Sequence, residues 1–195
     1  MPTETIVVAP GRICLFGEHQ DFLELSVIAA SINLNITLTC QSRHDDRFFL
    51  ELPDVCEKDH FHCDWDIAYR HDRDYLRSAT NVLKRHGLRL TRGHDCAVSG
   101  TIPINAGTAS SSALVVAWTA FLLHTQEGDL PRDPQAIAHY AHEAEVLEFD
   151  EGGAMMDHFA SALGGLLYID CRKPVTPTRL PAVLDRSFER RAQLG

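Results

Sequence analysis

Alternating hydrophobic and polar residues predict β-strands near both ends of the chain. A period of two places successive side chains on opposite faces, which is typical of a half-buried strand. The longest such stretch, residues 26–39, is rich in β-branched residues and predicts one long strand or two. The remaining predicted strands are short and cover residues 5–9, 13–16, 47–52, 95–98 and 166–169.

Apolar residues at helical spacing predict four helices. The predicted segments are residues 74–86, 113–124, 133–147 and 156–163. Gly87 follows the first of them, where glycine often ends a helix, and Asp133-Pro134 provides an N-cap and a first-turn proline for the third. The segment at residues 113–124 is almost entirely apolar, so we expect that helix to be buried.

Residues 53–72 are acidic and rich in histidine, and their pattern has no clear period. They contain Cys56, His60, His62 and Cys63, which are residue types that bind zinc. The spacing of these four residues matches no common zinc motif. We therefore expect a solvated loop there rather than a metal site.

Composition and charge narrow the class of protein. The chain has 195 residues, of which 45% are hydrophobic, so it can bury one substantial core. A net charge of −9 disfavours nucleic acid or an anionic membrane as a partner. The chain has no uncharged apolar run long enough for a transmembrane helix, and its first residues lack the features of a secretory signal. We therefore expect a cytoplasmic protein with six reduced cysteines.

The stretch between the strand at residues 95–98 and the apolar helix is suited to holding phosphate. It consists of small and polar residues, and three serines stand where the helix would begin. A helix N-terminus attracts anions through its unpaired N–H groups and its dipole, and small residues allow close backbone approach. The stretch is not a Walker A loop, and a serine N-cap after a turn is the simpler alternative. The predicted phosphate-binding residues are Asn105, Ala106, Gly107, Thr108, Ala109, Ser110, Ser111 and Ser112.

Two further motifs carry a family resemblance. Gly11 to Asp21 follow the pattern Gly-Arg-x-x-Leu-x-Gly-Glu-His-x-Asp, and Met156 to Ser161 follow Met-Asp-x-Phe-x-Ser. Together with the serine stretch, these motifs resemble the GHMP kinases, a family of small-molecule kinases. The first motif is most similar to that of galactokinases.

The resemblance implies an α+β fold, a two-layer sandwich like ribosomal protein S5 domain 2. It implies that residues 1–173 form an ATP-binding N-terminal domain and that residues 174–195 begin a linker to a missing C-terminal domain. We therefore expect a fragment, a truncated product, or a chain completed by a separate C-terminal domain or by a homo-oligomer. Activity of the 195 residues alone stays open.

The resemblance also assigns roles to residues of the first and last motifs. Asp157 would face the acceptor hydroxyl, and its place at a helix start favours the ionised carboxylate. Arg12 would pair with Asp157 and stabilise charge in the transition state. These two are the predicted catalytic residues. Glu18, His19 and Asp21 would bind the hydroxyls of the acceptor, although a histidine between carboxylates is often a local hydrogen-bond partner.

A magnesium site follows from the same resemblance. Ser112 and Glu145 are the predicted metal ligands, and Glu148 is a rival to Glu145. Mg²⁺ would bridge phosphate oxygens with few protein ligands. The sequence departs from the galactokinase pattern at Asn105, at Thr108-Ala109 and at Phe22 to Leu25, so the sugar need not be galactose.

The resemblance and these patterns together predict an ATP- and Mg²⁺-dependent kinase that phosphorylates a hydroxyl of a sugar or polyol. A mevalonate-type or heptose-type kinase is the alternative among enzymes. A non-catalytic ligand-binding or regulatory module is the alternative from another class.

Overall fold

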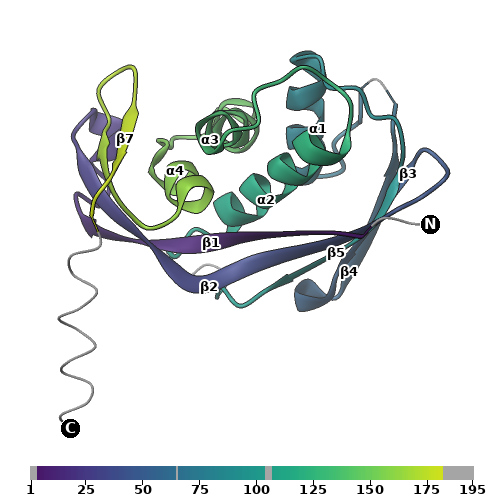
Figure 1. Cartoon of the computed structure of the whole chain (residues 1–195), viewed down its shortest axis with the longest axis horizontal. Helices are drawn as coiled ribbons and strands as arrows, with labels where there is room; N and C mark the ends of the chain where they lie inside the picture. Colours follow the sequence, from purple (N-terminus) through teal and green to yellow (C-terminus); the bar gives the residue numbers. More distant parts are fainter. Residues whose placement is uncertain (1–3, 65, 104–106, 182–195) are drawn as a thin grey trace, which may run out of the picture.

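A computed structural model describes residues 4–64, 66–103 and 107–181. Within these residues, seven strands form one sheet, and the helices pack together against one of its faces (Figure 1). The predicted two-layer α+β fold is therefore confirmed. The strands are β1 (Glu4–Phe16), β2 (Val27–Ser42), β3 (Arg47–Leu52), β4 (Glu57–His62), β5 (His94–Gly100), β6 (Leu166–Asp170) and β7 (Thr176–Arg179).

The long strand β2 organises the sheet. The strand order is β4-β3-β5-β2-β6-β7, and β1 pairs with β2 along most of its length. The pairing of β3 with β5 is parallel, and the other pairings are antiparallel. The prediction of one strand or two at residues 26–39 is thus resolved as a single strand.

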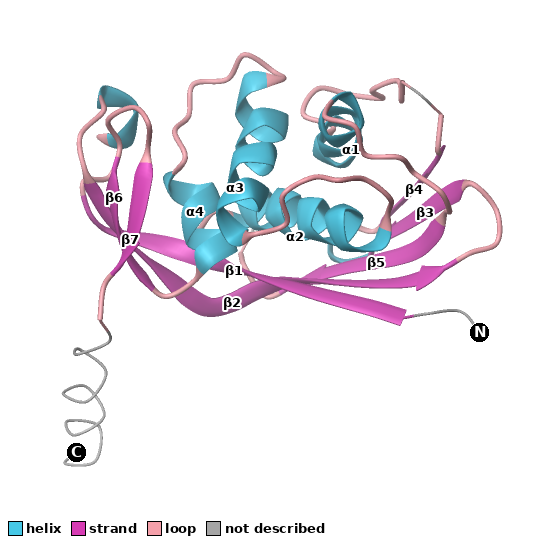
Figure 2. Cartoon of the chain, turned by 45° about the horizontal axis from the view of Figure 1, so that its top comes forward, coloured by secondary structure: helices cyan, strands magenta, loops and turns pink. Residues whose placement is uncertain are grey.

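The helical layer is built around a buried central helix (Figure 2). Its elements are α1 (Tyr75–Arg85), α2 (Ser110–Thr125), α3 (Pro134–His142), a π-helical turn (Glu143–Leu147) and α4 (Met156–Leu163). In α2, Trp118, Phe121 and Leu122 are completely buried, as the apolar pattern predicts. The predicted N-cap is also confirmed, because Asp133 accepts hydrogen bonds from two backbone N–H groups, both at 3.1 Å.

The N-terminal strand differs from the prediction of two short strands. Residues 5–9 and 13–16 belong to one strand, whose pairing with β2 is irregular between them. The register with β2 shifts between Pro10 and Arg12, where Pro10 pairs with Asn35 and Arg12 with Ser31. After this shift, Arg12 lies on the face covered by the helices, where it is 7% exposed.

The prediction of a loop across residues 53–72 is wrong at β4. This strand pairs with β3, and the rings of Phe48 and Phe61 stack with centroids 5.1 Å apart. Phe61 is buried, whereas most other side chains of β4 are charged or polar and partly exposed. Edge strands often carry such residues, which hides the period of two. In the described part of the chain, no three histidine, cysteine or acidic residues form a possible metal site.

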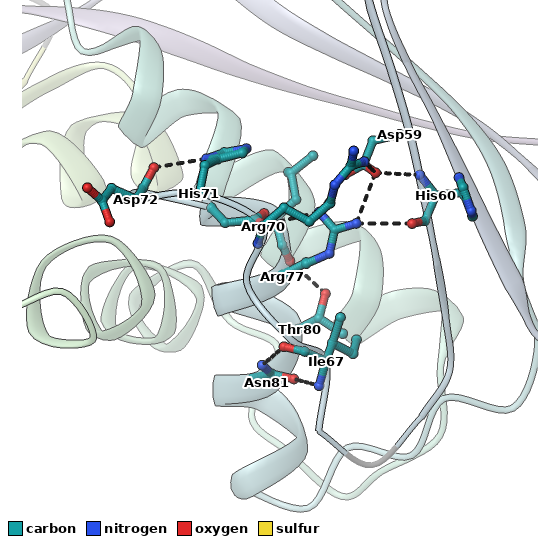
Figure 3. A network of polar contacts seen from close by, with 11 residues as sticks. Asp59, His60, Ile67, Arg70, His71, Asp72, Arg77, Thr80 and Asn81 are labelled. Carbon is teal, nitrogen blue, oxygen red and sulfur yellow. Dashed lines mark hydrogen bonds and ion pairs between the residues drawn. The ribbon is translucent and has the colours of Figure 1, made fainter.

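A polar network joins β4 to α1 (Figure 3). Arg77 of α1 donates to Asp59 at 2.9 Å and to the backbone carbonyl of His60 at 3.0 Å. Arg70 also contacts Asp59. Further along α1, Asn81 bonds to both the N–H and the carbonyl of Ile67, at 3.0 and 2.8 Å. These bonds hold the connection between β4 and α1 against the helix.

The sheet continues past residue 173, because β7 pairs with β6. The boundary between the ATP-binding domain and the linker, which the resemblance implies between residues 173 and 174, stays a prediction. Among the described residues, no helix combines the length and hydropathy needed to cross a membrane.

Candidate active site

A buried arginine joins the three motifs. The Arg12 guanidinium donates two hydrogen bonds to the Asp157 carboxylate, Nε to Oδ1 at 2.7 Å and Nη2 to Oδ2 at 3.0 Å. Its Nη1 donates to the carbonyl of Gly107 at 2.6 Å. Two parallel bonds to a carboxylate fix both side chains in distance and direction. Strand β1, helix α4 and the serine stretch therefore meet at Arg12.

The described part of the predicted phosphate loop leads directly into α2. Ala109 is the N-cap residue and has a left-handed backbone with φ of 59°, and the helix begins at Ser110. No side chain caps this helix in the described region, so the alternative of a serine N-cap does not hold there. The predicted residues Asn105 and Ala106 lie outside the described residues.

The predicted phosphate loop packs closely on β1. The N–H of Arg12 donates to the carbonyl of Thr108 at 3.1 Å, and a Cβ atom on Gly11 would lie 2.8 Å from the same oxygen. Gly107 has a positive φ of 69°, and a Cβ atom there would meet no atom of the described residues within 4 Å. The loop thus packs against β1 on one side, and the described residues leave space beside Gly107 on the other.

The predicted catalytic, acceptor and metal residues share one cavity of about 340 Å³. Its lining includes every one of these residues: Arg12, Glu18, His19, Asp21, Ser112, Glu145 and Asp157. Ser111 of the phosphate loop also lines it. The three motifs, which are far apart in the sequence, therefore form one polar hollow.

The predicted acceptor residues lie in the turn after β1. Glu18 approaches Arg12 to 3.9 Å, and His19 has a left-handed backbone with φ of 61°. Asp21 begins a short 3₁₀ turn and accepts a hydrogen bond from the N–H of Phe22 at 3.1 Å. Burial raises the pKa of Asp21 above its ordinary value, and the nearby charge of Asp157 acts in the same direction.

Glu145 reaches the cavity from the π-helical turn, and its side chain is 9% exposed. Burial works against its charged form, but His158, Ser111 and Ser112 hydrogen-bond to it and hold the pKa of Glu145 below its ordinary value. The rival Glu148 contacts Tyr69 and Arg85 instead and is not part of the cavity lining. The geometry therefore favours Glu145 over Glu148 for the predicted metal role.

Two features of this region escaped the sequence patterns. His158 bonds to Glu145 at 2.8 Å, and its only signal in the sequence is its place next to Asp157. An apolar groove of about 640 Å³ also lies beside the start of α2. Its lining comes from several separate segments and includes Ile36, Leu52, Val98, Ile102, Leu114 and Ser110, so no local pattern could reveal it.

Family comparison agrees with the motifs. The GHMP kinases N terminal domain matches residues 74–165, and the galactokinase galactose-binding signature matches residues 2–42. The chain therefore carries a GHMP kinase N-terminal domain, preceded by a galactokinase galactose-binding signature. A galactokinase from Haemophilus influenzae (strain PittEE) is 32% identical over 184 residues, which cover 91% of this chain and 47% of the relative. The chain thus spans about half the length of this galactokinase.

Solved structures support the same fold. Lactococcus lactis galactokinase complexed with galactose superposes with a TM-score of 0.80 at 22% identity, over 91% of this chain and 47% of that chain. A D-glycero-D-manno-heptose 1-phosphate kinase from Bacteriodes thetaiotaomicron gives a TM-score of 0.78 at 19% identity, over 92% of this chain and 60% of that chain. The architecture is that of the N-terminal part of GHMP kinases, and the sequence is galactokinase-like.

Proposed function

We propose that this chain is the nucleotide- and acceptor-binding part of an ATP-dependent kinase that phosphorylates a sugar hydroxyl. The single observation that carries the proposal is the paired Arg12–Asp157 contact, which joins the phosphate loop to the acceptor residues. Phosphoryl transfer depends mainly on alignment and charge stabilisation. An arginine held by both the loop and the carboxylate would provide that alignment.

The residues present fit a nucleotide with Mg²⁺. The N-terminus of α2 offers backbone N–H groups to phosphates, and the open space beside Gly107 allows them to approach. The apolar groove next to Ser110 would take the base. Ser112 and Glu145 would provide oxygen ligands for Mg²⁺, and the lowered pKa of Glu145 suits a metal ligand. When bound, Mg²⁺ neutralises charge on the phosphates.

The acceptor side of the cavity would hold the sugar. Glu18, His19 and Asp21 offer hydrogen-bonding groups suited to ring hydroxyls. Asp157 would orient the reacting hydroxyl and accept its proton, while Arg12 keeps the carboxylate in place. The exposed Phe22 stands in this lining where the galactokinase pattern differs. A heptose-type or mevalonate-type acceptor is therefore the second candidate.

Transfer of radioactive γ-phosphate from ATP to a panel of acceptors tests the proposal. The panel contains galactose, other aldoses, a heptose phosphate and mevalonate. We expect a sugar to be labelled at a hydroxyl, and the labelled sugar identifies the substrate class. Binding of ATP and sugar without any transfer would instead support a ligand-binding module. Failure to bind either one would contradict the proposal.

A further inference from the structure

A buried histidine–carboxylate contact lies next to the proposed catalytic pair. His158 is 2% exposed, and its Nε2 lies 2.8 Å from Oε2 of Glu145. The other ring nitrogen, Nδ1, has no hydrogen-bond partner among the described residues. The ring of His142 packs edge-on against His158, with centroids 5.2 Å apart. The hydrogen bond of His158 is therefore directed at Glu145.

The backbone around Glu145 is unusual in the same place. α3 gives way to the π-helical turn Glu143–Leu147, and Glu145 is its central residue. Such turns are rare and often occur at functional sites, because they redirect side chains from their α-helical positions. A carboxylate that is 9% exposed also needs hydrogen-bond partners to remain buried and charged. His158, Ser111 and Ser112 are these partners.

The first turn of α4 links two of the carboxylates that line the cavity. Asp157 and His158 are adjacent in the first turn of α4, where Asp157 accepts from Arg12 and His158 contacts Glu145. A displacement of this turn would move both carboxylates together. The position of Glu145 is thus tied to the position of Asp157.

We infer that His158 is a positioning residue, which fixes the Glu145 carboxylate in the orientation that binds Mg²⁺. The inference rests on the proposed function. Hydrogen-bond partners of metal ligands hold the ligand atoms in direction, and their removal commonly weakens metal binding 10–100-fold. Through this bond, His158 keeps the metal ligand in register with Asp157.

Calorimetric titration of the 195-residue chain with a non-hydrolysable ATP analogue, at a series of Mg²⁺ concentrations, tests this role. In His158→Gln, the side-chain amide can reach Glu145 as the imidazole does, so the Mg²⁺ dependence should stay near that of the unaltered chain. In His158→Asn, the amide is one methylene too short. We expect the half-saturating Mg²⁺ concentration to rise about 10–100-fold, with nucleotide affinity in the absence of Mg²⁺ unchanged.

His86 provides a matched control, because it makes a similar contact with Glu143 at 2.9 Å on the exposed surface. His86→Asn should leave the Mg²⁺ dependence unaltered. If His158→Asn does not fold, His158→Met removes the hydrogen bond while filling the space, and the same results are expected.

Two results would overturn the role of His158 while the proposed function stands. One is an unchanged Mg²⁺ dependence in the Asn or Met variant. The other is an equal loss of Mg²⁺-free nucleotide affinity in both the Gln and Asn variants, which indicates a structural role. If the unaltered chain binds no nucleotide at any Mg²⁺ concentration, the proposed function fails and the inference fails with it.

Discussion

At the scale of single residues, Arg12 holds the site together through its charge. Its side chain is 9% exposed and bonds to Asp157 and to the carbonyl of Gly107. A buried guanidinium is stable only with such partners, and removing one of them leaves the other charge unpaired. Substitution of either residue of the pair is therefore expected to have a large effect.

We expect Asp157→Asn to lower kcat by roughly 10²–10⁴, the usual contribution of a positioned acid–base group. The amide keeps the shape of the side chain but removes its negative charge. Affinity for nucleotide and sugar should change little, because the interaction matters most in the transition state. Steady-state kinetics on a preparation that transfers phosphate measures this. Combining the change with Arg12→Met should cost less than the product of the single effects, since the two residues act as a unit. An unchanged kcat would reduce Asp157 to an ordinary residue of a helix start.

Changes at Glu18 and Asp21 should affect the acceptor rather than the nucleotide. Loss of one charged hydrogen bond to the sugar costs about 1.5–3 kcal/mol of binding free energy. Glu18→Gln and Asp21→Asn should therefore weaken sugar binding, and calorimetry with separate sugar and ATP titrations measures both affinities. Glu24→Gln, in the same turn but not part of the cavity lining, is the control. Loss of ATP affinity with sugar affinity retained would mean that the two half-sites are exchanged.

At the scale of elements, most helices and strands follow from periodicity, and the exceptions have physical causes. The pattern predicts α1, α2 and α4 because each buries a face or is buried throughout. It misses β4, because a charged edge strand has only Phe61 in the core. The π-helical turn is also missed, since it continues the apolar spacing of α3 without a distinct composition. The cavity also depends on a long-range contact beside the register shift between β1 and β2, where Arg12 bonds to Asp157 across 145 residues of sequence.

The close contact between β1 and the phosphate loop predicts a strong effect at Gly11. In Gly11→Ala, the new Cβ would lie 2.8 Å from the carbonyl oxygen of Thr108, so backbone must move. Overpacking of this kind typically costs 1–3 kcal/mol. We expect a lower free energy of unfolding and weaker nucleotide binding, measured by chemical denaturation and calorimetry. Gly152→Ala, whose Cβ would meet nothing within 4 Å, should leave stability unchanged. Equal stability of the two variants would contradict the packing argument.

The network between β4 and α1 predicts a pH-dependent contribution to stability. Burial works against the charge of Asp59, but hydrogen bonds from Arg77, from the N–H of His60 and from Arg70 lower the pKa of Asp59 to about 2. A carboxylate with a lowered pKa stabilises the fold above its unfolded pKa, about 3.9, and this contribution is lost as the pH falls toward 2.

Asp59→Asn should therefore lower the free energy of unfolding at neutral pH by about 1–3 kcal/mol. The substitution removes one of the two charged acceptors of the buried Arg77 and leaves Asp74 as the other. The difference from the unaltered chain should shrink between pH 4 and pH 2. Urea denaturation across this range measures it. Asp72→Asn is the control, because Asp72 contacts His71 through its backbone carbonyl. A difference that stays constant down to pH 2 would contradict the network's charge-based role.

At the scale of the whole molecule, the helices cover one face of the sheet (Figure 1). The cavity is lined by residues of β1, α2 and α4, together with the turns beside them. Sequence motifs identify which residues gather there, but they do not reveal the bond between His158 and Glu145 or the apolar groove beside Ser110. Those depend on packing between segments that are distant in the sequence. The chain spans about half the length of its galactokinase relative.

The central claim is that nucleotide phosphates and a sugar are held on either side of the Arg12–Asp157 pair. A crystal structure of the chain with a non-hydrolysable ATP analogue, Mg²⁺ and galactose tests it most directly. We expect phosphates against the backbone of residues 107–112, and a sugar against Glu18 and Asp21 with one hydroxyl at the Asp157 carboxylate. A nucleotide bound elsewhere, or a sugar that makes no contact with this cavity, would contradict it.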